Sequence, residues 1–290
     1  MVVVQYLKPP PFRGEYVCTF GYVGMNCTAV TLAVCDNEVW VVVRDLDPRI
    51  KQYRFLRFDA VRWTPLPQWA TGYIGYASLH SIHVAADVVL LVYDDIVSLW
   101  QRTPPVCMWK RYIQNDGGLY ATWNADAREA WIVEEENRHT VFHRVDCDGN
   151  SVVVMSLPHT MLPFEVSFLH CHNNDVFLGE RRWSSKHFPG NFLWPAEQRY
   201  ESGYESGYDC TDASTSDDYV ALTREVRWDF HEVSVYERTE GRLLWRLDRD
   251  TIERVLATDY RSFCPTKIAW TSSGELLMLE TIVGVIHAFH

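Results

Sequence analysis

The first residues in this sequence that could do chemistry are His170, Cys171 and His172. Side chains two residues apart on a β-strand share one face, so the two imidazoles could point the same way. A metal ion bound there would need a third ligand, which Asp212 or His83 could supply from neighbouring strands. The other interpretation is a histidine pair that hydrogen-bonds adjacent strands. The metal interpretation therefore names His170, His172 and Asp212 as candidate ligands.

A second candidate is the segment Asp146-Cys147-Asp148-Gly149-Asn150, which is similar to the start of a calcium-binding loop. A loop of that kind needs a bidentate acid further along the chain, and the apolar residues 151–155 that follow supply none. Asp-Gly between two alternating strands is typical of a β-hairpin. The sequence therefore predicts a hairpin turn at this place.

A third candidate is the stretch 201–218, ESGYESGYDCTDASTSDD, which is acidic and holds neither Lys nor Arg. Such a segment cannot build a hydrophobic core, so we expect a solvated loop. It could attract a basic protein partner, accept phosphate on Tyr204, Tyr208 or its Ser/Thr cluster, or be an acidic insertion without a partner. The candidate protein-binding residues are Glu201, Tyr204, Glu205, Tyr208 and Asp209, with Arg181, Arg182 and Trp183 shortly before them.

Basic residues gather at 44–62 and again at 181–186, which raises RNA as an alternative partner, with tryptophans as stacking surfaces. Several aspartates interrupt the first group. The formal net charge of −11 argues against a dedicated nucleic-acid binder, because phosphate contacts need an excess of Lys and Arg. Nucleic acid is therefore not the expected partner.

Composition excludes disorder as the overall state. Apolar residues make up 47% of the 290 residues, and 12 Trp, 15 Tyr and 13 Phe provide ample mass for a core. The sequence has no apolar window long enough for a membrane-spanning helix, and its first residues lack the pattern of a secretory signal. The eight cysteines are dispersed without a CxxC pair, so we expect reduced thiols and an intracellular location, cytoplasmic or nuclear.

The elements that must position these residues are predicted to be short β-strands, with one helix of about two turns starting near a capping box at residues 250–253. One layout recurs: a small or polar strand, a turn with Asp, Asn or Gly, and a strongly apolar strand. Its six copies recur every 41 to 57 residues. Such spacing, with four strands a unit, is typical of β-propeller blades. The copies are anchored at Val39, Val89, Ala130, Val176, Tyr219 and Leu276.

These units predict one all-β domain over residues 1–290, a six-bladed β-propeller with an irregular acidic insertion at about 183–216. The last unit ends after three strands, so we expect residues 1–7 to pair with residues 284–290 and complete that blade. A seventh blade within 183–210 is the alternative. Trp63, Trp109 and Trp245 are expected at equivalent positions in the fourth strands.

This layout resembles the β-propeller superfamily, loosely its WD-repeat-like and quinoprotein-like groups, over nearly the whole chain. The run Gly241 to Trp245, GRLLW, looks like the end of a quinoprotein-type blade, whereas the Gly-His and Trp-Asp dipeptides of WD repeats are missing. The resemblance implies loop-built faces on a rigid ring.

The sequence holds no phosphate-binding loop, nucleophile elbow or zinc-protease motif, so we expect no catalytic residues and no cofactor. The favoured function is a non-enzymatic protein–protein interaction module, a scaffold subunit of a larger complex that binds protein partners, in particular basic ones. The alternatives are a metal-dependent hydrolase or lyase with its site in the central channel, and an RNA-contacting subunit of a ribonucleoprotein.

Overall fold

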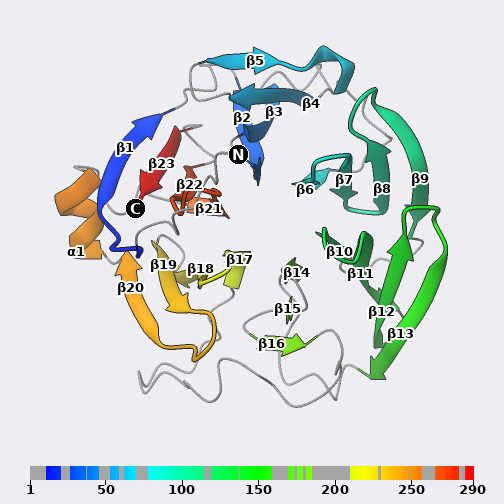
Figure 1. Cartoon of the computed structure of the whole chain (residues 1–290). Coiled ribbons are helices and arrows are strands. Elements are labelled where there is room, and N and C mark those ends of the chain that lie inside the picture. The colour runs from blue at the N-terminus through cyan, green and yellow to red at the C-terminus, as the bar shows by residue number, and fades with distance from the viewer. Residues whose placement is uncertain are drawn as a thin grey trace, which may run out of the picture.

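A computed structural model describes residues 11–20, 27–36, 38–45, 53–58, 62–69, 78–113, 119–136, 138–158, 169–172, 175–178, 181–184, 210–227, 230–247, 249–256, 265–280 and 285–290. Most of them are in short antiparallel strands. These strands form five sheets of four strands and one sheet of three. The sheets surround a common axis (Figure 1), which is the arrangement of a β-propeller and confirms the predicted all-β, propeller-like fold.

Three four-stranded sheets come first along the chain. They are β2 (Cys27–Cys35), β3 (Glu38–Asp45), β4 (Tyr53–Phe58) and β5 (Trp63–Pro65); then β6 (Leu79–Val84), β7 (Val88–Tyr93), β8 (Ile96–Gln101) and β9 (Val106–Tyr112); then β10 (Leu119–Asn124), β11 (Glu129–Glu136), β12 (His139–Asp146) and β13 (Ser151–Pro158). Each is a simple meander, so neighbours in sequence are neighbours in the sheet.

The three-stranded sheet contains β14 (Leu169–His172), β15 (Asp175–Leu178) and β16 (Arg181–Ser184). The next meander is β17 (Cys210–Thr215), β18 (Tyr219–Arg227), β19 (Phe230–Glu237) and β20 (Leu243–Leu247). The composite sheet joins β21 (Pro265–Trp270), β22 (Leu276–Glu280) and β23 (Val285–Phe289) to β1 (Tyr16–Phe20). β17 therefore occupies the end of the predicted insertion at 183–216.

In the β6–β9 sheet, the second strand from the centre, β7, consists only of apolar residues. In β7, all six side chains from Val88 to Tyr93 are at most 2% exposed. Such a strand is buried on both faces because a neighbouring sheet packs on each side, which explains its continuous apolar sequence. Each buried Val or Leu contributes about 1.5–3 kcal/mol to folding. The six repeated pairs of strands predicted from the sequence are all present in the structure.

Aromatic side chains fill the wedge between neighbouring sheets. Trp69, in the short helical turn η1 (Pro67–Trp69), contacts Trp40 with ring centroids 5.8 Å apart and Trp100 at 6.2 Å. Trp63, Trp109 and Trp245 lie in β5, β9 and β20, the outermost strands, as predicted.

The strand that completes the composite sheet is β1, and the prediction that residues 1–7 do so is wrong. β23 pairs with β22 on one edge and with β1 on the other, so both of its edges are occupied. Residues 1–10 lie outside the described residues. The register places Thr19 opposite His287, and Tyr16 packs against Phe289 with ring centroids 5.6 Å apart. Contacts with β23 thus favour residues 16–20, YVCTF, as its partner strand, although residues 2–6, VVVQY, are more apolar.

The predicted helix is present as α1 (Arg249–Thr251) and a wider helical turn over Ile252–Leu256. Ile252 is fully buried against the β17–β20 and composite sheets, and Leu256 packs on the same cluster. None of the described helices is long and apolar enough to cross a membrane. The six cysteines whose side chains are described form no disulfide with one another.

Candidate functional site

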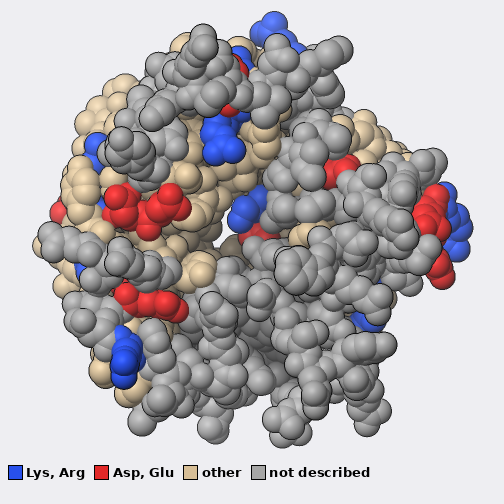
Figure 2. Space-filling model, turned by 180° about the vertical axis from the view of Figure 1, so that it is seen from behind, with Lys and Arg blue, Asp and Glu red and all other residues tan. Residues whose placement is uncertain are grey.

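The axis of the ring holds a cavity of about 560 Å³. This volume lies within the range of small-molecule sites. Figure 2 shows the centre of one face hollowed, with basic and acidic side chains at the edge of the hollow. Residues of all six innermost strands line the cavity, among them Thr31, Ser81, Trp123, His170, Asp212 and Lys267.

The charged groups of the channel are paired across two sheets. Lys267 Nζ on β21 lies 3.6 Å from Asp212 Oδ1 on β17, and Asp212 Oδ2 accepts a hydrogen bond from the backbone N–H of Ile268 at 2.9 Å. Burial raises the pKa of Asp212, and the neighbouring Lys267 ammonium opposes that rise. The pair therefore joins the β17–β20 sheet to the composite sheet at the channel wall.

Two histidines of the channel also bridge neighbouring sheets. His170 Nε2 on β14 lies 2.8 Å from Thr215 Oγ1 on β17. His83 Nε2 on β6 lies 3.0 Å from the carbonyl oxygen of Ala121 on β10, to which it must donate a proton. Burial lowers the pKa of His83 to about 4. His83 is therefore neutral at pH 7 and acts as a hydrogen-bond donor between sheets.

The depressed pKa of His83 predicts a pH-dependent stability. Between pH 6.5 and 4 the unfolded chain takes up a proton at this imidazole and the folded chain does not, so stability falls as pH falls. Its contribution has a slope of up to about 1.4 kcal/mol per pH unit. The test is His83→Gln, which keeps an N–H donor. Its free energy of unfolding, measured in urea, should fall less than that of wild type between pH 6.5 and pH 4. Parallel profiles would contradict this, since all other groups titrate identically in both proteins.

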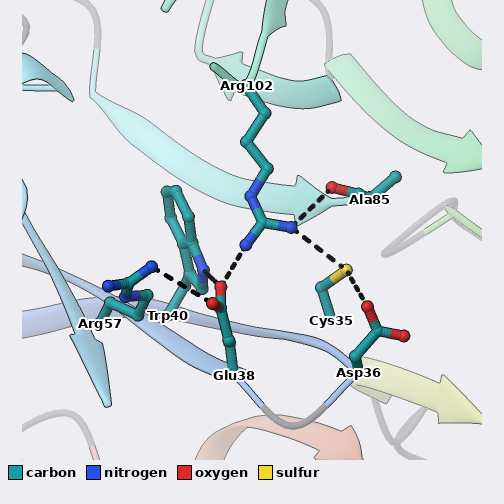
Figure 3. A network of polar contacts seen from close by, with 7 residues as sticks. All are labelled: Cys35, Asp36, Glu38, Trp40, Arg57, Ala85 and Arg102. Carbon is teal, nitrogen blue, oxygen red and sulfur yellow. Dashed lines mark hydrogen bonds and ion pairs between the residues drawn. The ribbon is translucent and has the colours of Figure 1, made fainter. Parts of the chain in front are cut away.

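At one mouth of the channel, a polar network joins the β2–β5 and β6–β9 sheets (Figure 3). Arg102, just after β8, forms an ion pair with Glu38 at the start of β3 and donates to the carbonyl oxygen of Ala85 at 3.2 Å. Its guanidinium also lies 5.3 Å from the centroid of the Trp40 ring. Arg57 binds the other oxygen of Glu38 at 3.2 Å. Two guanidinium groups thus share one carboxylate, which fixes the relative position of the two sheets.

The described part of the chain contains no assembled metal site. Asp212 and His170 contact Lys267 and Thr215 respectively, and no group of three His, Cys, Asp or Glu side chains lies within ligand distance there. His172 is the last residue of β14, and its side chain lies outside the described residues. The alternative of histidines that hydrogen-bond neighbouring strands is confirmed for His170.

The segment 146–150 is a turn, as predicted. It connects β12 and β13, and Asp146 Oδ1 accepts hydrogen bonds from the backbone N–H groups of Asp148 and Asn150, both at 2.9 Å. The side-chain amide of Asn150 donates to the other oxygen at 2.9 Å. These hydrogen bonds, led by the Asn150 amide, lower the pKa of Asp146.

The predicted protein-binding residues are described only in part. Arg181, Arg182 and Trp183 belong to β16, where they pair with Leu178, Phe177 and Val176 of β15. Their side chains lie outside the described residues, as do Glu201, Tyr204, Glu205, Tyr208 and Asp209 entirely. Residues 210–218 of the acidic stretch are described. The last two of them, Asp217 and Asp218, lie in the turn after β17.

Exposed apolar side chains on the outermost strands are a feature that the sequence reasoning missed. On β9, Val106, Met108 and Tyr112 are 50%, 42% and 63% exposed, and on β13, Val152 and Val153 are 56% and 58% exposed. The alternating sequence of β9, VCMWKRY, could have predicted this exposure, because every second residue of an outer strand faces away from the neighbouring sheet. Exposed apolar side chains mark an interaction surface where they lie together in one patch.

No protein-family model matches the chain, and no curated protein is similar to it in sequence. The arrangement of small antiparallel sheets around a central axis places the protein, at the level of fold, in the β-propeller class.

Proposed function

We propose that the protein is a non-enzymatic interaction module, a β-propeller platform that binds other proteins. The observation that carries the proposal is the set of exposed apolar side chains on β9 and β13, Val106, Met108, Tyr112, Val152 and Val153. In the channel wall, Lys267 with Asp212, His170 with Thr215, and His83 with Ala121 join neighbouring sheets, which suits a supporting role. The outer strands instead offer apolar surface to a partner.

The same proposal gives the ring six blades, with the β14–β16 sheet as the sixth. Several contacts between innermost strands support this: β2 lies against β6 and β21, β10 lies against β14, and β17 lies against β14 and β21. The hydrogen bond between His83 and Ala121 connects β6 to β10. A ring braced in this way would hold its loops in fixed positions, which lowers the entropic cost of binding.

The acidic stretch is proposed as one contact surface for a basic partner. Replacing Glu201, Glu205 and Asp209 with serine removes three negative charges, so a basic partner should bind the variant more weakly than wild type. This difference in binding should become smaller as the salt concentration increases. The measurement is affinity capture of partners from native extract with the tagged full chain, at low salt and at roughly 0.5 M salt, with mass spectrometry.

The matched control replaces three exposed carboxylates elsewhere, Asp95, Asp126 and Asp148, with serine. It carries the same change in charge and should capture the wild-type set of proteins. Equal loss with both variants would overturn the role of the acidic stretch. Failure of the wild-type chain to retain any protein above a blank matrix, or specific retention of RNA instead, would overturn the platform proposal itself.

A further inference from the structure

A second cavity, of about 670 Å³, lies where the N-terminal described segment crosses the β17–β20 sheet. One wall comes from residues 11–13, which lead into β1. The other comes from the turn between β17 and β18, the turn between β19 and β20, and the first half of β20. The lining consists of Pro11, Phe12, Arg13, Asp217, Asp218, Tyr219, Glu237, Thr239, Arg242, Leu244 and Trp245.

Three aromatic rings form the floor of this cavity. Phe12 packs edge-on against Trp245 with ring centroids 5.6 Å apart and lies 6.1 Å from Tyr219. The backbone N–H of Phe12 donates to the Tyr219 hydroxyl at 3.1 Å. Phe12 is itself buried, so the aromatic floor is fixed in place before any ligand arrives. The faces of such rings attract cations.

Three carboxylates and two guanidinium groups are among the residues that line the cavity. Asp217, Asp218 and Glu237 face Arg13 and Arg242 among the lining residues. Arg242 is already paired with Glu237, with 3.2 Å between its Nη2 and Oε2. The Asp217 side chain is 87% exposed and lies 3.9 Å from Arg238, which also donates to the carbonyl oxygens of residues 216 and 217. Asp217 is therefore the most exposed carboxylate of the lining.

We propose that this cavity, the aromatic–acidic pocket, binds the arginine side chain of a basic segment in a protein partner. A planar guanidinium can stack on an aromatic face and donate two hydrogen bonds to a carboxylate at once, which a lysine ammonium cannot do. The pocket also lies at the end of the acidic stretch 201–218, whose charge draws a basic segment toward it. The inference rests on the proposed function and deepens it.

The test uses three short peptides that differ only at one central residue: arginine, citrulline or lysine. Citrulline has the shape of arginine without its charge. Binding to the full chain is measured by calorimetry at low and at high salt. The arginine peptide should bind at least about five-fold more tightly than the citrulline peptide, an advantage that shrinks as salt increases. The lysine peptide should bind with intermediate strength.

The variant for this test is the Asp217→Asn, Asp218→Asn double substitution. It should reduce arginine-peptide binding to the level of the citrulline peptide. The control is Asp126→Asn with Asp148→Asn, the same charge change at two exposed turns of the β10–β13 sheet, and it should bind like wild type. If the double variant unfolds at a lower temperature than wild type, the single substitution Asp217→Asn at the 87%-exposed position decides the question.

Equal binding of the arginine and citrulline peptides would overturn the proposal, as would an equal loss with the control variant. Preferential binding of an acidic peptide or of an RNA oligonucleotide in the pocket would also overturn it. Because partner capture by the full chain is measured separately, a negative peptide result with intact capture would refute the pocket alone. Loss of capture by the wild-type chain would instead refute the platform function.

Discussion

Replacing His287 with leucine is expected to lower the free energy of unfolding by about 3–5 kcal/mol, because it leaves a buried carboxylate without its partner. His287 Nε2 lies 2.9 Å from Glu280 Oε2, and the two residues are 7% and 6% exposed. The other imidazole nitrogen, Nδ1, lies 3.0 Å from Thr19 Oγ1 on β1. The array therefore spans β22, β23 and β1, and urea unfolding measures its contribution.

The β10–β13 sheet offers a matched control. Glu134 pairs with Val141 in the sheet register and Glu280 with Val285, and a histidine follows two residues later in each case, His143 and His287. Among the described residues, Glu134 differs from Glu280 in also having a cationic partner, because Arg111 Nε from the neighbouring sheet lies 2.7 Å from its Oε1. His143→Leu should therefore cost clearly less than His287→Leu.

Removing both partners at once tests the cause of the loss. The double substitution Glu280→Leu, His287→Leu should recover most of the stability that His287→Leu loses, since no buried carboxyl group is left without a partner. An equal cost for His143→Leu and His287→Leu, or no recovery in the double variant, would show that the carboxylate is not what makes His287 necessary.

The second large effect is expected for Gly14→Ala. Gly14 has a positive φ of 71°, and a Cβ added there would lie 2.0 Å from Nε1 of the Trp245 indole. The strained backbone and the overlap with a packed ring together should cost about 2–4 kcal/mol. Gly14 lies between Phe12 and β1. The substitution should therefore also make the composite sheet unfold before the other sheets. Thermal unfolding and hydrogen exchange at residues 15–20 measure both effects.

Gly149→Ala separates the two causes. Gly149 also has a positive φ, of 86°, but an added Cβ would meet its nearest neighbour, Trp109, at 3.3 Å. Its cost should be about 1 kcal/mol, the penalty of the backbone conformation alone. If Gly14→Ala proved no worse than Gly149→Ala, the indole would not hold the N-terminal segment in place.

The fold class followed from the sequence because the strongest signals are local. A run such as VVLLVY is buried on both faces, and Asp-Gly at residues 148–149 specifies a turn, so strands and hairpins could be predicted one at a time. The six-fold recurrence of these pairs then predicted the ring. The outer position of Trp63, Trp109 and Trp245 followed from the same recurrence.

The contacts between sheets could not be predicted in this way. Arg102 and Glu38 are 64 residues apart, and no periodicity says that they meet. The choice of β1 over residues 1–7 likewise depends on Thr19 reaching His287 and on Gly14 fitting beneath Trp245, which the sequence does not display. The aromatic–acidic pocket combines residues from both ends of the chain, so it too emerges only from the fold.

β1 completes the composite sheet by pairing with β23, and a cysteine cross-link tests this pairing most directly. The register places the native Cys18 opposite Ala288, and directly opposed residues of antiparallel strands bring their Cβ atoms within about 4.5–5.5 Å. Oxidation of Ala288→Cys, followed by peptide mapping, should give an intramolecular disulfide between positions 18 and 288 that is absent from wild type. A thiol at position 288 that remains reduced, or that joins another cysteine instead, would contradict the account.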